Sequence, residues 1–118
     1  MKKILVADDS STMRNFLRRT LTKSGYDVVG EADDGFKAIE LYEKLRPDLL
    51  IVDVIMPELS GLEVVRQIIE LNADAKIIVC TSMGQHYHRE EAVKSGISGY
   101  IVKPFVPEEI IEAVEKII

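Results

Sequence analysis

Short apolar runs alternate along the chain with longer segments in which apolar residues lie three or four positions apart. Such runs, bounded by polar residues or glycine, are typical of β-strands. We therefore expect five strands, at Lys3–Ala7, Asp27–Ala32, Leu49–Asp53, Lys76–Thr81 and Gly99–Val102. The runs Leu49–Val52 and Ile77–Cys80 are apolar at every position, which indicates central strands buried on both faces.

The segments between these runs have the period of amphipathic helices. Their apolar stripes are Met13, Phe16, Leu17 and Leu21, then Ala38, Leu41, Tyr42 and Leu45, then Leu62, Val65 and Ile69. A helix over Pro107–Ile118 begins with proline and two glutamates, which a helix N-terminus favours. A further helix is expected over His86–Ser95, because Gly96 provides a suitable end.

Five strands that alternate with five helices predict a doubly wound α/β domain with one parallel sheet. Each parallel return needs a right-handed crossover, so helices are expected on both faces of the sheet. Residues 1–118 are interpreted as a single domain. Ligands of such folds bind beyond the carboxyl ends of the strands.

Composition narrows the classes of partner. A hydrophobic fraction of 47% in 118 residues is enough for a buried core, and the net charge of -5 disfavours nucleic acid and anionic membranes as partners. The single cysteine, Cys80, cannot form an internal disulfide, and no apolar stretch has the length of a membrane helix. We expect a cytoplasmic protein.

Charged and polar side chains stand at the expected carboxyl ends of four strands. They are Asp8 and Asp9 after the first strand, Asp53 at the end of the third, Thr81 at the end of the fourth, and Lys103 with Pro104 after the fifth. At about 4 Å and an effective dielectric constant of about 20, each pair of carboxylates would repel by roughly 4 kcal/mol. A divalent cation would relieve this repulsion, and a ligand set made only of oxygen favours Mg²⁺.

With such a cation the residues suit phosphoryl transfer, which depends mainly on positioning and on neutralisation of charge. Asp53 is the candidate nucleophile, and Asp8 and Asp9 are the candidate metal ligands. Lys103 can pair with one phosphate oxygen, and Thr81 can donate a hydrogen bond to another. An isolated pair of aspartates is more often a helix cap, so the interpretation depends on all of these residues together.

From end to end the chain resembles a bacterial response-regulator receiver domain. The stretches that carry this resemblance are Ile4–Ser10, Asp53–Gly61, Thr81–Ser82 and Tyr100–Phe105. The resemblance implies a flavodoxin/CheY-like sheet with strand order 2-1-3-4-5. It further implies that a histidine kinase phosphorylates Asp53, that Asp9 and Asp53 ligate Mg²⁺ with the backbone carbonyl of Ile55, and that Asp8 acts through water.

Three further roles follow from the resemblance alone. The peptide bond before Pro104 is expected to be cis, Thr81 to move toward the phosphate, and Tyr100 to turn inward in response. An aromatic residue on the last strand is also commonly a packing residue, and the two interpretations of Tyr100 are compatible. In the family that the chain resembles, the side chains two positions beyond the phosphorylated Asp and the switch Thr influence attack by water. Ile55 and Met83 stand at these positions and are apolar, so slower self-dephosphorylation is expected than in a variant with Asn or Glu there.

The stretches Ser10–Arg14 and Cys80–Gln85 are similar to chemotaxis regulators that consist of this domain alone. This similarity implies a monomeric phospho-acceptor switch that catalyses only its own phosphorylation and dephosphorylation. Its expected partners are a CheA-type histidine kinase and a flagellar motor switch protein or other output target, which would bind the face made by the fourth helix, the fifth strand and the fifth helix.

Three alternatives remain open at this point. The chain could be a phosphorelay intermediate, which passes its phosphoryl group to a histidine phosphotransfer protein, or the receiver of a larger regulator. A small Mg²⁺-dependent phosphohydrolase would need a general acid where Ile55 stands and a segment to cover the substrate.

His86 and His88 lie two positions apart and cannot share a helical face, so they are interpreted as the solvated start of a helix.

Overall fold

Five parallel strands form one sheet in the order β2-β1-β3-β4-β5 in the computed structural model, which describes residues 1–82, 94 and 96–118. The elements in chain order are β1 (Lys3–Ala7), α1 (Ser11–Lys23), β2 (Asp27–Ala32), α2 (Gly35–Leu45), β3 (Leu49–Asp53), α3 (Gly61–Leu71), β4 (Ile77–Ser82), β5 (Gly99–Lys103) and α5 (Pro107–Ile117). The predicted fold class and the strand order implied by the resemblance are confirmed.

The strand boundaries agree closely with the sequence pattern. β1, β2 and β3 have the predicted bounds, whereas β4 is shifted by one residue and β5 continues to Lys103. The described residues contain four helices, one fewer than the five predicted. The helix predicted over His86–Ser95, together with Met83, His86 and His88, lies outside the described residues apart from Lys94.

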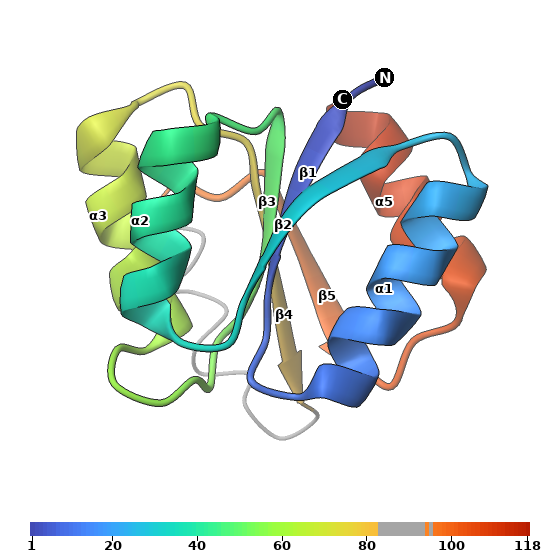
Figure 1. The fold of residues 1–118 in the computed structure, drawn as a ribbon, viewed down its shortest axis with the longest axis horizontal. Coiled ribbons are helices and arrows are strands. Elements are labelled where there is room, and N and C mark those ends of the chain that lie inside the picture. Colours follow the sequence, from blue (N-terminus) through green and yellow to red (C-terminus); the bar gives the residue numbers. More distant parts are fainter. Residues whose placement is uncertain (83–93, 95) are drawn as a thin grey trace.

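Helices cover both faces of the sheet. Helices α2 and α3 lie on one side and α1 and α5 on the other, with β2 at the edge nearest the viewer (Figure 1). All five residues of β3 are buried, and alternate residues contribute to two separate core clusters: Leu50 and Val52 pack toward α2 and α3, and Leu49 and Ile51 toward α1 and α5. This confirms β3 as a central strand.

The predicted helix stripes are buried unequally. Leu17 and Leu21 of α1 are fully buried, but Met13 and Phe16 are only partly buried and pack against the edge of the α1/α5 cluster. Phe16 contacts Phe105, with ring centroids 5.9 Å apart. Both residues are partly buried and pack against the core cluster on the α1 and α5 side of the sheet.

Short polar caps start the helices close to the ends of the strands. The side chains of Ser10, Asp34 and Ser60 each accept a hydrogen bond from the backbone amide three residues later, which satisfies a donor that the first helical turn leaves unpaired. Ser10 directly follows the acidic pair, so the cap of α1 also restricts the turn that carries this pair. Within the described part of the chain, the helices lack the length and apolar character needed to cross a membrane.

Candidate functional site

The residues predicted to form a site meet at the carboxyl edge of the sheet. Asp8 follows β1, Asp53 ends β3, and Lys103 ends β5. The Lys103 ammonium nitrogen lies 2.9 Å from Asp8 Oδ2 and 2.9 Å from Asp53 Oδ2. One cation therefore joins carboxylates that are 95 and 50 residues away from it in the sequence.

Asp9 completes a cluster of three carboxylates. Asp8, Asp9 and Asp53 each offer an oxygen atom, and these atoms all lie within 4.8 Å of one another. Asp8 and Asp53 are buried, whereas Asp9 is exposed and borders solvent. The single ammonium of Lys103 leaves the group with excess negative charge, and its oxygen donors suit a hard divalent cation. The cluster could hold a metal ion.

Burial and neighbouring charges shift the pKa values of Asp53 and Lys103. Burial raises the pKa of Asp53, and the hydrogen bond and charge of Lys103 offset only part of that effect. Burial alone would lower the pKa of Lys103, but its contacts with Asp53 and Asp8 raise it above the usual value. Lys103 thus stays charged at neutral pH, while the anionic form of Asp53 is disfavoured enough to gain from further positive charge.

The loop after β3 holds the Asp53 carboxylate in place. The Ile55 amide donates a hydrogen bond to Asp53 Oδ1 at 3.3 Å, and the Gly61 amide donates to the Val54 carbonyl at 2.8 Å. A Cβ atom on Gly61 would overlap the Asp53 carbonyl oxygen and lie 2.9 Å from Val54 Cα. Only glycine allows this close approach of the α3 N-terminus to the Asp53 backbone.

The other predicted site residues lie on β4 and β5 and in the segments that follow β3 and β5. Thr81 is buried near the end of β4, where it pairs in register with Val102 of β5. Tyr100 of β5 is half-buried, and its hydroxyl oxygen is shielded from solvent. The peptide bond between Lys103 and Pro104 is cis, as the resemblance implied. Ile55, whose amide donates to Asp53, is 54% exposed.

Two residues at this edge had no predicted role. Arg14 of α1 donates a hydrogen bond from Nη1 to the backbone carbonyl oxygen of Asp8 at 2.7 Å, and its Nε donates to Glu31 Oε1 at 3.1 Å. Glu31 belongs to β2. In the sequence, Arg14 is only a basic residue one turn into a predicted helix. Such residues are usually solvated, so the pattern gave no reason to expect a contact between Arg14 and the site.

A groove on the helical surface does not mark this site. It has a volume of about 820 Å³ and lies between α1 and α5, lined by residues that include Phe16 and Ile111. None of the predicted site residues lines it. The candidate site is therefore identified by the charged side chains that meet at the carboxyl edge of the sheet, and not by this groove.

Comparison with known proteins gives consistent matches over nearly the whole chain. The family model of the response regulator receiver domain matches residues 4–115. The chemotaxis protein CheY of Thermotoga maritima is 43% identical over 116 residues, which cover 98% of this chain and 97% of that protein. The chemotaxis protein CheY of Listeria monocytogenes is 39% identical, with 98% of each chain covered.

A solved structure matches the fold closely. The crystal structure of a two-component response regulator of the LuxR family from Aurantimonas sp. SI85-9A1 superimposes with a TM-score of 0.93 at 32% identity, covering 99% of this chain and 84% of that one.

Proposed function

This chain belongs to the response regulator receiver domain family, and on that premise we propose that it is a response regulator of chemotaxis signalling. Residues 1–118 act as one receiver domain, in which phosphoryl transfer from a histidine kinase to Asp53 switches the binding of a partner. The observation that carries the proposal is the Lys103 ammonium, which lies 2.9 Å from both Asp8 and Asp53 beside the exposed Asp9. The relatives named chemotaxis protein CheY support the choice of pathway.

The nucleophile in the proposed reaction is the Asp53 carboxylate. One of its oxygens forms a bond to the phosphorus of a phosphohistidine, and the phosphorus–nitrogen bond breaks with its electron pair going to the histidine, which then takes up a proton. Asp53 is only 8% exposed, so few water molecules compete for the phosphorus. The Ile55 amide, which donates to Asp53 Oδ1, restricts the rotation of the attacking carboxylate.

Lys103 acts by charge in this reaction. Its ammonium carries three donors, so it can keep its contact with Asp8 while pairing with an oxygen of the incoming phosphoryl group. Thr81, buried at the end of the neighbouring strand β4, is the proposed donor to a second phosphoryl oxygen. Both residues stabilise charge on the equatorial oxygens, which is the main demand of phosphoryl transfer.

Mg²⁺ is the proposed cofactor because the donor set of the cluster is all oxygen. The residues proposed to hold it are Asp9, Asp53 and the backbone carbonyl of Ile55, with Asp8 acting through water. When bound, Mg²⁺ supplies positive charge to the phosphoryl oxygens.

Phosphorylation is proposed to shift a two-state equilibrium of the domain, so that an output target binds one state better. Thr81 and Tyr100 are the proposed switch residues, and they lie on the adjacent strands β4 and β5. A CheA-type histidine kinase and a flagellar motor switch protein are the proposed partners.

The direct test is phosphorylation by acetyl phosphate or by a phosphorylated CheA-type kinase, with the product resolved by intact mass. We expect one phosphoryl group, which is lost on treatment with hydroxylamine and appears only with Mg²⁺. The Asp53→Asn variant should not be labelled, whereas Asp48→Asn, which removes an aspartate outside the cluster, should be labelled as the wild type is. Labelling that persists in Asp53→Asn would contradict the proposal.

The phosphorelay alternative predicts a different fate of the phosphoryl group. Mixing the phosphorylated protein with a histidine phosphotransfer domain should leave the label on Asp53 if the output is partner binding. Rapid transfer of the label to the phosphotransfer domain would favour the relay.

A further inference from the structure

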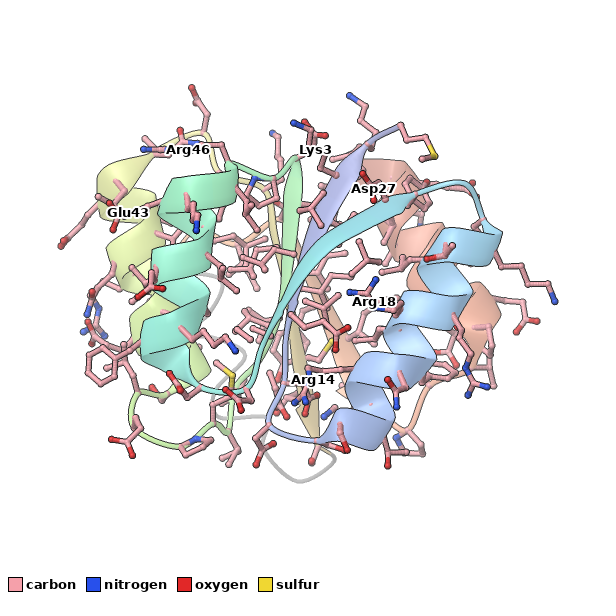
Figure 2. The ribbon with its side chains drawn as sticks, in the orientation of Figure 1. Lys3, Arg14, Arg18, Asp27, Glu43 and Arg46 are labelled. Carbon is pink, nitrogen blue, oxygen red and sulfur yellow. The ribbon has the colours of Figure 1, made fainter. Side chains whose placement is uncertain are left out.

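An ion-pair network connects α1, β2 and the acidic turn. The carboxylate of Glu31 accepts from Arg14 Nε at 3.1 Å through one oxygen and from Arg18 Nε at 2.6 Å through the other. In Figure 2 both arginines lie between α1 and β2, and Arg14 is the one nearer the carboxyl edge of the sheet. Burial alone would raise the pKa of Glu31, but its contacts with Arg18 and Arg14 lower it, so Glu31 is ionised at neutral pH.

Arg14 differs from Arg18 in its second contact. Its Nη1 donates to the Asp8 carbonyl oxygen at 2.7 Å, whereas Arg18 Nη1 lies 3.5 Å from the carbonyl oxygen of Val28. The side chain of Arg14 is 18% exposed, and that of Arg18 is 45% exposed. Arg14 is therefore largely buried and connects the Glu31 carboxylate to the backbone carbonyl of Asp8.

Hydrogen bonds restrain both the backbone and the side chain of Asp8. Its amide donates to the Ala32 carbonyl at 3.0 Å, its Oδ1 accepts from the Ser10 amide at 2.9 Å, and its Oδ2 accepts from Lys103. The Arg14 contact fixes the remaining group, the carbonyl of the peptide that joins Asp8 to Asp9. The Asp9 side chain makes no hydrogen bond with the residues that the structure describes, so its direction depends on that peptide.

We propose that Arg14 is a positioning residue for the acidic site: anchored by Glu31, it orients the Asp8–Asp9 peptide and so aims the Asp9 carboxylate at the metal. The inference rests on the proposed function, because it assumes that the cluster binds Mg²⁺. The planar guanidinium can donate to two acceptors on different elements at once, which the point charge of a lysine cannot do with the same geometry.

The direction in which removal of Arg14 changes the Mg²⁺ affinity distinguishes a positioning role from a purely electrostatic one. Arg14 carries a positive charge near the site, so its removal would strengthen Mg²⁺ binding if charge were its only influence. Loss of positioning has the opposite effect. Residues that orient metal ligands typically contribute about 10-fold or more to affinity, and we expect the Mg²⁺ dissociation constant of Arg14→Gln to rise about 10-fold.

The experiment compares Mg²⁺ binding by isothermal titration calorimetry in four proteins: wild type, Arg14→Gln, Arg14→Lys and Arg18→Gln. Arg18→Gln is the matched control, because it removes the same charge and a contact with Glu31 but leaves the Asp8 carbonyl bonded. It should bind Mg²⁺ as the wild type does or slightly more tightly. Arg14→Lys keeps the charge and loses the two-point contact, so it should bind more weakly than the wild type.

The possible results lead to different conclusions. Unchanged or tighter binding by Arg14→Gln, or equal weakening in Arg14→Gln and Arg18→Gln, would overturn the proposal. If Arg14→Gln does not fold by circular dichroism, Arg14→Lys decides: wild-type affinity overturns the proposal, and weaker binding supports it. Wild-type protein that binds no Mg²⁺ would instead show that the metal site of the proposed function is wrong.

Discussion

Replacing Lys103 by methionine is expected to destabilise the metal-free protein at neutral pH. Lys103 is the only cation within hydrogen-bonding distance of the Asp8 and Asp53 carboxylates among the described residues, and both carboxylates are buried. The methionine has a similar length but no charge. Its introduction leaves two buried carboxylates whose oxygens lie within 4.8 Å of each other without a counter-ion.

The size of the loss follows from the geometry. At 2.9 Å and an effective dielectric constant of about 20, each contact of Lys103 corresponds to a gross attraction of about 6 kcal/mol. Desolvation of the ions offsets much of this, and removal of one partner from a buried ion pair typically costs about 3–5 kcal/mol. We expect Lys103→Met to lose a similar amount, which is a large part of the roughly 5–15 kcal/mol that stabilises an ordinary domain.

The variant should recover stability when the pH is lowered. Burial raises the pKa of Asp53 even beside Lys103, so the folded protein holds this proton more tightly than the unfolded chain does. Stability linked to Asp53 is therefore present below its ordinary pKa and is lost as the pH rises through its raised pKa. Without Lys103 that pKa rises further, and the loss between mildly acidic and neutral pH should be steeper than in the wild type.

Urea unfolding monitored by circular dichroism, with EDTA or with millimolar Mg²⁺, measures these effects. Mg²⁺ should restore part of the stability of Lys103→Met, since it replaces the missing positive charge. The control is Lys116→Met, which removes a helix pair with Glu112 whose side chains are 72% and 69% exposed, and which should cost at most about 0.5 kcal/mol. Equal stability of Lys103→Met and wild type, or a loss that neither pH nor Mg²⁺ changes, would refute the reasoning.

Four further outcomes are expected. Asp9→Asn should stabilise the metal-free protein in urea unfolding, because it relieves repulsion among the three carboxylates, and should lose the stabilisation by Mg²⁺. The gain should be only about 0.5–1 kcal/mol, because Asp9 is exposed. Gly61→Ala should cost about 1–3 kcal/mol and slow phosphorylation by acetyl phosphate, because the new Cβ would displace the Asp53 backbone. Burial raises the pKa of Cys80 to about 12, so iodoacetamide should alkylate it only after unfolding. Ile55→Asn should shorten the phosphate lifetime measured by loss of label, and a longer lifetime would contradict the interpretation of Ile55.

The sequence pattern was sufficient for the fold class, because the alternation of strands and helices follows from local periodicity, whereas the strand order was implied by the family resemblance. Short runs rich in apolar and β-branched residues located β1, β2 and β3 to the residue. The crossover rule for parallel strands then placed the residues at their carboxyl ends on one edge. The meeting of Asp8, Asp53 and Lys103 was therefore predictable from chain order and strand ends alone. The boundaries of β4 and β5 were less certain, because Lys76 and Lys103 are polar residues that fit either a strand or a loop.

Other features required the tertiary structure because they depend on distances between atoms that no local pattern encodes. The pairing of β1 with β2 changes register between Ile4 and Leu5, so that Val6 lies opposite Glu31. Only that register and the rotamer of Arg14 connect Glu31 to the Asp8 carbonyl. Hydrophobic periodicity determines which face of an element is buried, and the three-dimensional packing of those faces decides which polar atoms come within bonding distance.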